Sequence, residues 1–64
     1  MTITEIHTSL VTGQKKQMVA QIEEYGLYEF WTDYKEYVTT HYGIPGILEY
    51  FTDATISYFR IKNR

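Results

Sequence analysis

Two histidines, His7 and His41, carry the side chains of this chain that most often bind metal ions or transfer protons. They are far apart in the sequence, and each lies in a stripe of apolar residues. A metal site or an acid–base pair needs Asp, Glu or Cys partners on the same face, and neither histidine has such partners at a suitable spacing. The chain also contains no cysteine. We therefore interpret both histidines as packed, partly buried rings, and we expect no metal site, no cofactor and no catalytic centre.

Three carboxylates, Glu29, Asp33 and Glu36, follow an i, i+4, i+7 spacing. On a helix this spacing places them along one face, where they form an acidic ridge. The sequence lacks the Asp-x-Asp-x-Asp-Gly loop of an EF-hand, which excludes calcium binding of that type. The simplest interpretation is a solvated helix face, and the functional alternative is a docking ridge for a basic partner.

Two patterns that would indicate an enzyme are missing. The Gly-Ile-Pro-Gly sequence at residues 43–46 lacks the Lys-Ser or Lys-Thr that follows a phosphate-binding loop. Neither Ser9 nor Ser57 stands in the Gly-x-Ser-x-Gly pattern of a nucleophile elbow. We therefore expect a non-enzymatic protein.

The elements that position these side chains include a helix predicted over residues 27–43. At about 100° per residue, its apolar side chains fall within one arc of roughly 140° and its acidic side chains lie opposite. This arc predicts a helix packed on a core, with Trp31 as a buried core residue. The helix is expected to end at Gly43 in a left-handed C′ position, with Ile44 making the apolar contact that follows and Pro45 unable to continue the helix. The members of the arc are Leu27, Phe30, Trp31, Tyr34, Tyr37, Val38, His41 and Tyr42.

An earlier helix starts near Thr2, because Thr2 and Glu5 fit a capping box. Its apolar stripe weakens at Gly13 and resumes afterwards. The segment therefore forms either one helix with a weak point at Gly13 or two helices, the second from about residue 14 to 25. Gly26 is expected to end this segment.

The segment after Pro45 has two interpretations. As a helix, it leaves Ile56 and Phe59 pointing away from its main apolar face. As a strand, residues 55–61 use residue types that favour β structure, although no partner strand is evident. We therefore predict a compact all-α domain of three or four helices over residues 1–64, with an α+β fold containing a strand at 55–61 as the alternative. The main apolar face of the helical interpretation comprises Ile47, Tyr50, Phe51, Ala54, Tyr58 and Ile61.

Composition limits the classes of function. The net charge of −2 is too small to predict strong attraction to nucleic acid or to an anionic membrane. No stretch approaches the roughly 18 apolar residues of a membrane span, and the N-terminus lacks the pattern of a signal peptide. We therefore expect a cytoplasmic protein with no membrane association.

Aromatic residues are unusually frequent, with seven tyrosines, three phenylalanines and one tryptophan in 64 residues. This exceeds what a small core comfortably encloses, and Tyr and Trp often anchor interfaces. We therefore predict a protein–protein interaction module, a regulator or adaptor that binds a foreign partner or a second copy of itself. By analogy of size and composition, such domains include accessory proteins of phages or mobile elements that inhibit a host enzyme. The expected interaction residues are Tyr28, Glu29, Asp33, Glu36, Phe59, Arg60 and Lys62.

The alternative function is a small helix-turn-helix-like DNA-binding regulator. Its two helices would join through the turn at Gly43, and the second would end in the basic residues Arg60, Lys62 and Arg64. A helix that reads the major groove usually carries its base contacts near its N-terminal end. Here residues 47–50 are apolar and acidic, so nucleic-acid binding is the weaker interpretation.

Overall fold

The computed structural model describes residues 1–63, and its elements in these residues are all helical. In chain order they are α1 (Ile3–Val11), α2 (Lys15–Tyr25), α3 (Leu27–Gly46), the π-helical turn η1 (Ile47–Phe51) and α4 (Thr52–Lys62). The all-α prediction is confirmed. The alternative strand at residues 55–61 is wrong, because α4 buries Ala54 and Tyr58 while its backbone groups bond within the helix. Arg64, which the sequence analysis included in the basic end, lies outside the described residues.

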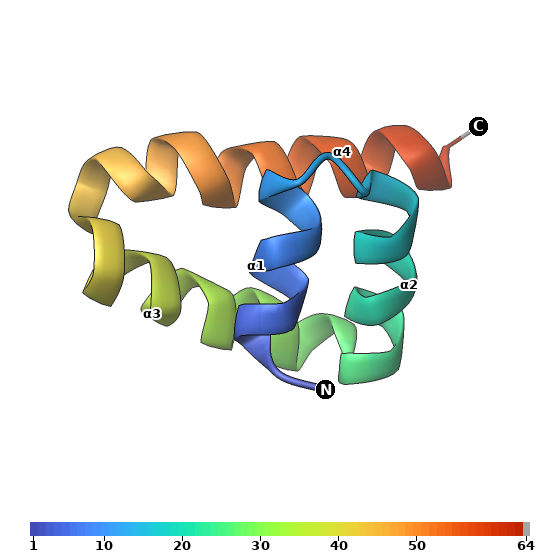
Figure 1. The fold of residues 1–64 in the computed structure, drawn as a ribbon, viewed down its shortest axis with the longest axis horizontal. Helices are drawn as coiled ribbons and strands as arrows, with labels where there is room; N and C mark the ends of the chain where they lie inside the picture. The colour runs from blue at the N-terminus through green and yellow to red at the C-terminus, as the bar shows by residue number, and fades with distance from the viewer. Residues whose placement is uncertain (64) are drawn as a thin grey trace.

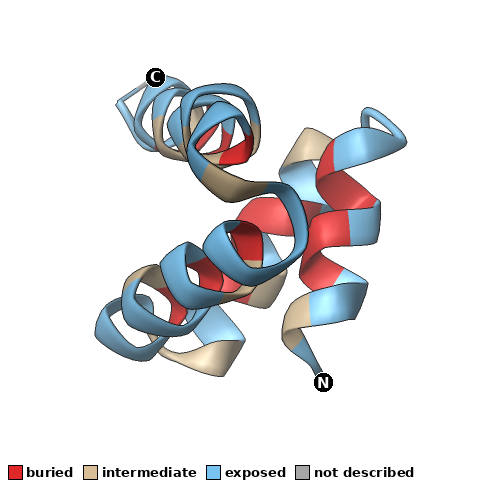
Figure 2. Ribbon diagram, turned by 90° about the vertical axis from the view of Figure 1, so that its left-hand side faces the viewer, coloured by how far each residue is buried: buried red, intermediate tan, exposed pale blue. Residues whose placement is uncertain are grey.

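The helices form two layers. Helix α3 and the η1–α4 segment diverge from the bend at Gly43, and α1 and α2 pack across the opening between them (Figure 1). Figure 2 shows the pair α1 and α2 on one side of the molecule and α3 and α4 on the other, with the buried residues facing inward. Helix α2 contacts both α3 and α4, so it joins the two diverging helices.

The core lies between these layers. The predicted apolar face of residues 47–61 points toward it, with Ala54 and Tyr58 buried and the other four members partly buried. On α3, however, the predicted arc of residues 27–42 is too wide. The run of α3 before the bend at Gly43, residues 27–42, is longer than α1 and α2, which span 9 and 11 residues, so both of its ends extend past the layer that covers it. The largest fully buried side chains are Tyr34, Phe30, Ile6, Met18, Ile22 and Val38.

The members of the predicted arc accordingly have three different environments. Phe30, Tyr34 and Val38 are fully buried. Trp31 is only partly buried, which corrects its prediction as a buried core residue, although its ring still packs against Phe30, Phe51 and Tyr58. Tyr37 is also partly buried, whereas the remaining members are exposed. These exposed members are Leu27, His41 and Tyr42.

Three of the helix boundaries follow the predicted signals. The hydroxyl of Thr2 accepts a hydrogen bond of 3.2 Å from the Glu5 amide and caps α1. Gly13, with φ +82°, separates α1 from α2, so the two-helix interpretation of the N-terminal segment is correct. Gly26, with φ +114°, ends α2 as expected. Positive φ at these positions is accessible to glycine at little cost.

Gly43 interrupts α3, as predicted, but in a different backbone conformation. Its φ of 71° is combined with ψ of −160°, a region that is essentially restricted to glycine and differs from the expected left-handed helical one. The chain therefore leaves Gly43 in another direction, and Ile44 is 72% exposed instead of making the expected apolar contact. Pro45 then lies in the first turn of the next helical run, where its missing N–H costs nothing.

The π-helical turn η1 is closed by Thr52. Both the backbone N–H and the hydroxyl of Thr52 bond to the carbonyl oxygen of Ile47, the hydroxyl at 3.1 Å. A π-helical turn holds an extra residue and therefore rotates the faces of the following helix. This rotation brings Ile56 to the same outer side of the segment as Leu48, and both side chains are exposed.

Candidate interaction surface

The helical run that follows the bend at Gly43, residues 44–62, carries four exposed apolar side chains on its outward face. Their exposed fractions are 72% for Ile44, 71% for Leu48, 47% for Ile56 and 49% for Phe59. With the exposed Thr52 between them, they follow the i, i+4 and i, i+3 spacing that aligns residues along one side of a helix. We call these four apolar residues the outer stripe. The opposite side of the same segment packs on the core, so the segment is apolar on two faces.

Half of the outer stripe was predicted from the sequence. Ile56 and Phe59 were expected to point away from the main apolar face, and both are exposed. Leu48 and Ile44, about two and three turns before Ile56, were not predicted. Ile44 was instead assigned to a helix cap, because the conformation of Gly43 has no signal in the sequence beyond the glycine itself.

Three charged residues lie along one flank of the outer stripe, and the middle one, Asp53, is paired with Lys15 at 2.7 Å. Glu49 follows Leu48 and Arg60 follows Phe59, so each is one residue beyond a stripe member. Both side chains are exposed, and neither forms an ion pair within residues 1–63. The flank therefore has a free negative charge at its start and a free positive charge near its end.

Lys62, another predicted interaction residue, is used within the fold. Its amino group forms an ion pair of 2.7 Å with Glu23 of α2, and this bond raises the pKa of Lys62. The pair fastens the C-terminal end of α4 to α2. Because both side chains are about half exposed, the pair contributes little to stability.

The acidic ridge and Tyr28 lie on α3. Glu29, Asp33 and Glu36 are all exposed, as expected for a solvated face. Asp33 accepts a hydrogen bond of 2.6 Å from the hydroxyl of Tyr25, which raises the pKa of that tyrosine. Tyr28 is 79% exposed. Within residues 1–63, no hydrogen bond or ion pair joins the ridge to Phe59, Arg60 or Lys62, so the predicted residues form two separate surfaces.

A cluster of rings surrounds His7 inside the molecule. His7 is buried, with its Nδ1 atom 2.9 Å from the Tyr34 hydroxyl and its Nε2 atom 3.1 Å from the Tyr42 hydroxyl. The rings of Tyr37 and Tyr50 lie 5.3 and 5.0 Å from the imidazole, centre to centre. The prediction of a packed, partly buried ring is correct for His7. It is wrong for the burial of His41, which is exposed although its ring stacks on Tyr37. The tyrosine partners of His7 come from distant parts of the chain, and sequence spacing could not identify them.

Hydrogen bonding in this cluster favours a neutral His7. A neutral imidazole has one donor and one acceptor nitrogen, so one tyrosine donates to it and the other accepts from it. A charged imidazole donates from both nitrogens, and the hydroxyl hydrogen of the fully buried Tyr34 would then need another acceptor. Burial lowers the pKa of His7, and the nearby charge of His41 lowers it further.

We expect the free energy of unfolding to decrease as the pH falls below about 6.5. Because the pKa of His7 is lower in the folded than in the unfolded chain, the unfolded chain takes up the proton first. The contribution of His7 to the free energy of unfolding is fully present above about pH 7. Below that pH it decreases by up to about 1.4 kcal/mol per pH unit, and the decrease levels off below the pKa of His7 in the folded chain. Urea unfolding of the natural chain and His7→Gln between about pH 5 and 8 measures this slope, and His41→Gln, which removes a charge that lowers the pKa of His7, should show a smaller slope than the natural chain. Equal slopes for the natural chain and His7→Gln would contradict the prediction.

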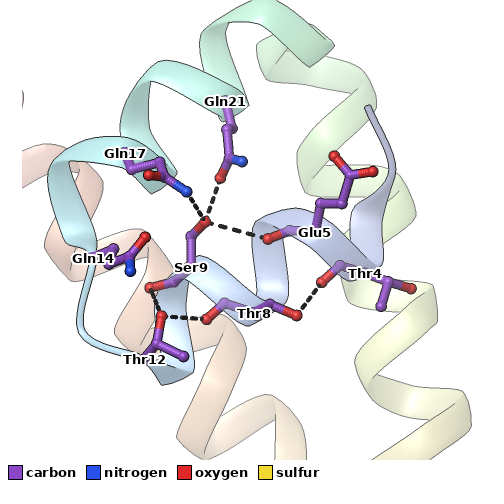
Figure 3. A pocket seen from close by; sticks show the side chains of 8 residues that line it. All are labelled: Thr4, Glu5, Thr8, Ser9, Thr12, Gln14, Gln17 and Gln21. Atoms are coloured by element: carbon purple, nitrogen blue, oxygen red, sulfur yellow. Dashed lines mark hydrogen bonds between the residues drawn. The ribbon is translucent and has the colours of Figure 1, made fainter.

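A polar groove of about 420 Å³ runs between α1 and α2 (Figure 3). At its centre the buried Ser9 hydroxyl donates to Gln21 Oε1 at 2.6 Å and accepts from Gln17 Nε2 at 3.1 Å. The side chains therefore satisfy one another, and Ser9 has no histidine partner that could activate it as a nucleophile. The groove is lined by Thr4, Glu5, Thr8, Ser9, Thr12, Gln14, Gln17 and Gln21.

A second pocket, of about 290 Å³, lies between the start of α2 and α4. Lys15 spans it by binding Asp53 at 2.7 Å and the hydroxyl of Ser57 at 3.2 Å. Lys16 and Arg60 also line this pocket. Arg60, one of the predicted interaction residues, thus lies between this basic pocket and the outer stripe.

No protein-family model, characterised protein or solved structure shows significant similarity to this chain. Residues 1–63 contain no group of three or more His, Asp or Glu side chains arranged to hold a metal ion. Within the same residues, no helix combines the length and apolar character needed to cross a membrane. Among residues 1–63, the outer stripe and the separate Tyr28 on α3 are exposed apolar features that the internal contacts of the fold do not cover.

Proposed function

We propose that this chain is a non-enzymatic protein-binding module that docks a partner protein on the outer stripe. The observation that carries the proposal is the second apolar face of the η1–α4 segment. A helix with one apolar face can bury that face against the core of a small domain, whereas a second apolar face needs another covering surface. Contiguous exposed apolar patches in soluble proteins often mark such interaction sites.

The dimensions of the outer stripe fit recognition of a helix or a groove. Ile44 and Phe59 are 15 positions apart, which corresponds to about 22 Å along a helix. Anchors at helical spacing over such a length are typical of helix-in-groove and helix-on-helix recognition. Phe59 supplies the aromatic anchor, and covering a large apolar side chain contributes up to about 1.5–3 kcal/mol.

Of the other predicted interaction residues, Arg60 borders the outer stripe directly. Glu49, which was not among the predicted residues, borders it as well. Tyr28 and the acidic ridge on α3 form a separate exposed surface, whose docking of a basic partner stays a prediction. A role as a regulator, adaptor or inhibitor of a host enzyme likewise stays a prediction. The DNA-binding alternative gains no support from η1, because the exposed Leu48 and Glu49 have neither the charge nor the donors for a DNA groove.

We expect a double substitution, Leu48→Ser with Ile56→Ser, to abolish partner binding while leaving the fold intact. Both side chains are exposed, so the substitutions should change the free energy of unfolding by only about 0.5 kcal/mol each. The measurement uses a photoactivatable benzoylphenylalanine at Thr52, in the middle of the outer stripe. Irradiation in the native cell should give a covalent adduct with one protein, which mass spectrometry identifies as foreign or as a second copy.

The control is Val11→Ser, which removes an exposed apolar side chain outside the outer stripe. The adduct at Thr52 should persist in this variant and disappear in the Leu48→Ser/Ile56→Ser variant. An adduct that survives the double substitution, or the absence of any protein adduct in the natural chain, would contradict the proposed function.

A further inference from the structure

We propose that the protein docked on the outer stripe is a second copy of this chain, paired antiparallel along the η1–α4 segment. This inference rests on the proposed function, because it uses the same surface. It adds the identity of the partner and the direction in which the two helices run.

The order of side chains along the outer stripe allows self-complementary pairing. A two-fold axis perpendicular to the helices brings the same surface of both copies together with reversed direction. Leu48 then lies opposite Phe59 of the second copy, and Thr52 lies opposite its Ile56. Each contact occurs twice, so both ends of the interface pair an aliphatic with an aromatic side chain.

The charges of Glu49 and Arg60 favour the antiparallel direction. Both residues lie on the same flank of the outer stripe, about three helical turns apart, and neither has an ion-pair partner within residues 1–63. In an antiparallel pair, the flank that carries Glu49 and Arg60 meets the same flank of the second copy, which runs in the opposite direction. Glu49 therefore faces Arg60 of the second copy at both ends of the interface. In a parallel pair, Glu49 would face the opposite flank. At the height of Glu49 that flank carries no cation, because residues 36–59 contain neither Lys nor Arg.

The size of the surface predicts a weak dimer. A contact along one helix face, about 22 Å long and 10 Å wide, is smaller than the roughly 800 Å² per partner of a standard stable interface. We therefore expect dissociation in the micromolar range, where monomer and dimer exchange with concentration. Such a dimer also leaves the helix surface accessible at lower concentration.

Sedimentation equilibrium between about 1 and 300 μM tests the association. The natural chain should show a monomer–dimer equilibrium, and Leu48→Ser with Ile56→Ser should remain monomeric. Single reversals, Glu49→Arg or Arg60→Glu, should each weaken the dimer about 10-fold, because they place like charges opposite each other. The double reversal Glu49→Arg/Arg60→Glu should restore the affinity to within about threefold. Circular dichroism checks that each variant remains helical.

Disulfide trapping tests the direction independently, since the natural chain has no cysteine. An equimolar mixture of the Leu48→Cys and Phe59→Cys variants should oxidise to a heterodimer. Neither variant should form a disulfide dimer by itself in an antiparallel arrangement, whereas a parallel arrangement would give Leu48→Cys homodimers.

The outcomes separate this inference from the proposed function. A monomer at every concentration, or a dimer that persists in the Leu48→Ser/Ile56→Ser variant, would overturn self-pairing. The proposed function would then depend on a foreign adduct at Thr52 that the same double substitution removes. Leu48→Cys homodimers, or a double charge reversal that fails to restore association, would overturn the antiparallel arrangement.

Discussion

Replacing Tyr34 with alanine is expected to lower the free energy of unfolding by about 4 kcal/mol, within the range for removing a large buried aromatic side chain. The Tyr34 ring is fully buried and stacks on Phe30 at 4.9 Å. It also packs against the rings of Tyr37 and Phe51, each with its centre 6.1 Å away. Its hydroxyl is a partner of His7, so the substitution removes both a ring and a buried hydrogen bond.

Two milder substitutions separate these contributions. Tyr34→Phe keeps the ring and leaves His7 Nδ1 without its partner, which should cost about 1–3 kcal/mol. Tyr34→Leu keeps part of the apolar volume and should fall between the other two. Because a 64-residue chain has little stability in reserve, Tyr34→Ala is expected to be largely unfolded, and urea denaturation of the milder variants provides the quantitative comparison. A loss below 1 kcal/mol for Tyr34→Leu would mean that Tyr34 is not a central core residue.

Local patterns predicted the faces of the helices well. Ala54 and Tyr58 were placed inward and Phe59 outward from spacing alone, because a helix repeats every 3.6 residues whatever it packs against. The glycines at 13, 26 and 43 marked the interruptions for a similar local reason, since positive φ strongly favours glycine. These conclusions depend only on residues within a few turns of one another.

Features that depend on the arrangement of the helices were not predicted. The exposure of Leu27 and Tyr42 follows from the length of α3 relative to α1 and α2, whereas Trp31 is partly exposed because it lies toward the edge of the predicted arc. The bonds from His7 to Tyr34 and Tyr42 require α1 to lie against α3. The π-helical turn has no sequence pattern that distinguishes it from an α-helix. Leu48 could be recognised as part of the outer stripe only once that turn placed it on the same side as Ile56.

Several of the tyrosines that first indicated an interface instead make contacts within the fold. Tyr34 and Tyr42 bond to His7, and Tyr50 packs against it, so much of the apparent aromatic surplus belongs to the interior cluster. The outer stripe is mostly aliphatic, with Phe59 as its aromatic member, whereas the exposed Tyr28 belongs to the separate surface on α3. The chemistry of the outer stripe therefore differs from the tyrosine-rich interface that composition suggested.

Replacing Gly46 with alanine is expected to destabilise the fold by about 2–3 kcal/mol, the upper part of the range for overpacking. Helix propensity predicts the opposite sign, because Gly46 has helical angles of −67° and −36° and alanine is favoured over glycine by about 1 kcal/mol in a helix. However, Gly46 is buried, and an added Cβ would overlap the Cβ of Tyr42 and stand 3.0 Å from Cγ1 of Val38. The backbone after the Gly43 bend thus packs directly on α3.

Gly13→Ala is the matched control for this substitution. An added Cβ at Gly13 meets no atom within 4 Å, so its cost comes only from the backbone angle of φ +82°. Asparagine tolerates positive φ better than alanine does, so Gly13→Asn should recover part of the loss at that position. Gly46→Asn should be at least as destabilising as Gly46→Ala, because its side chain is larger. Urea denaturation distinguishes the two causes, and a stabilising Gly46→Ala would show that the chain after the bend does not approach Tyr42 and Val38 closely.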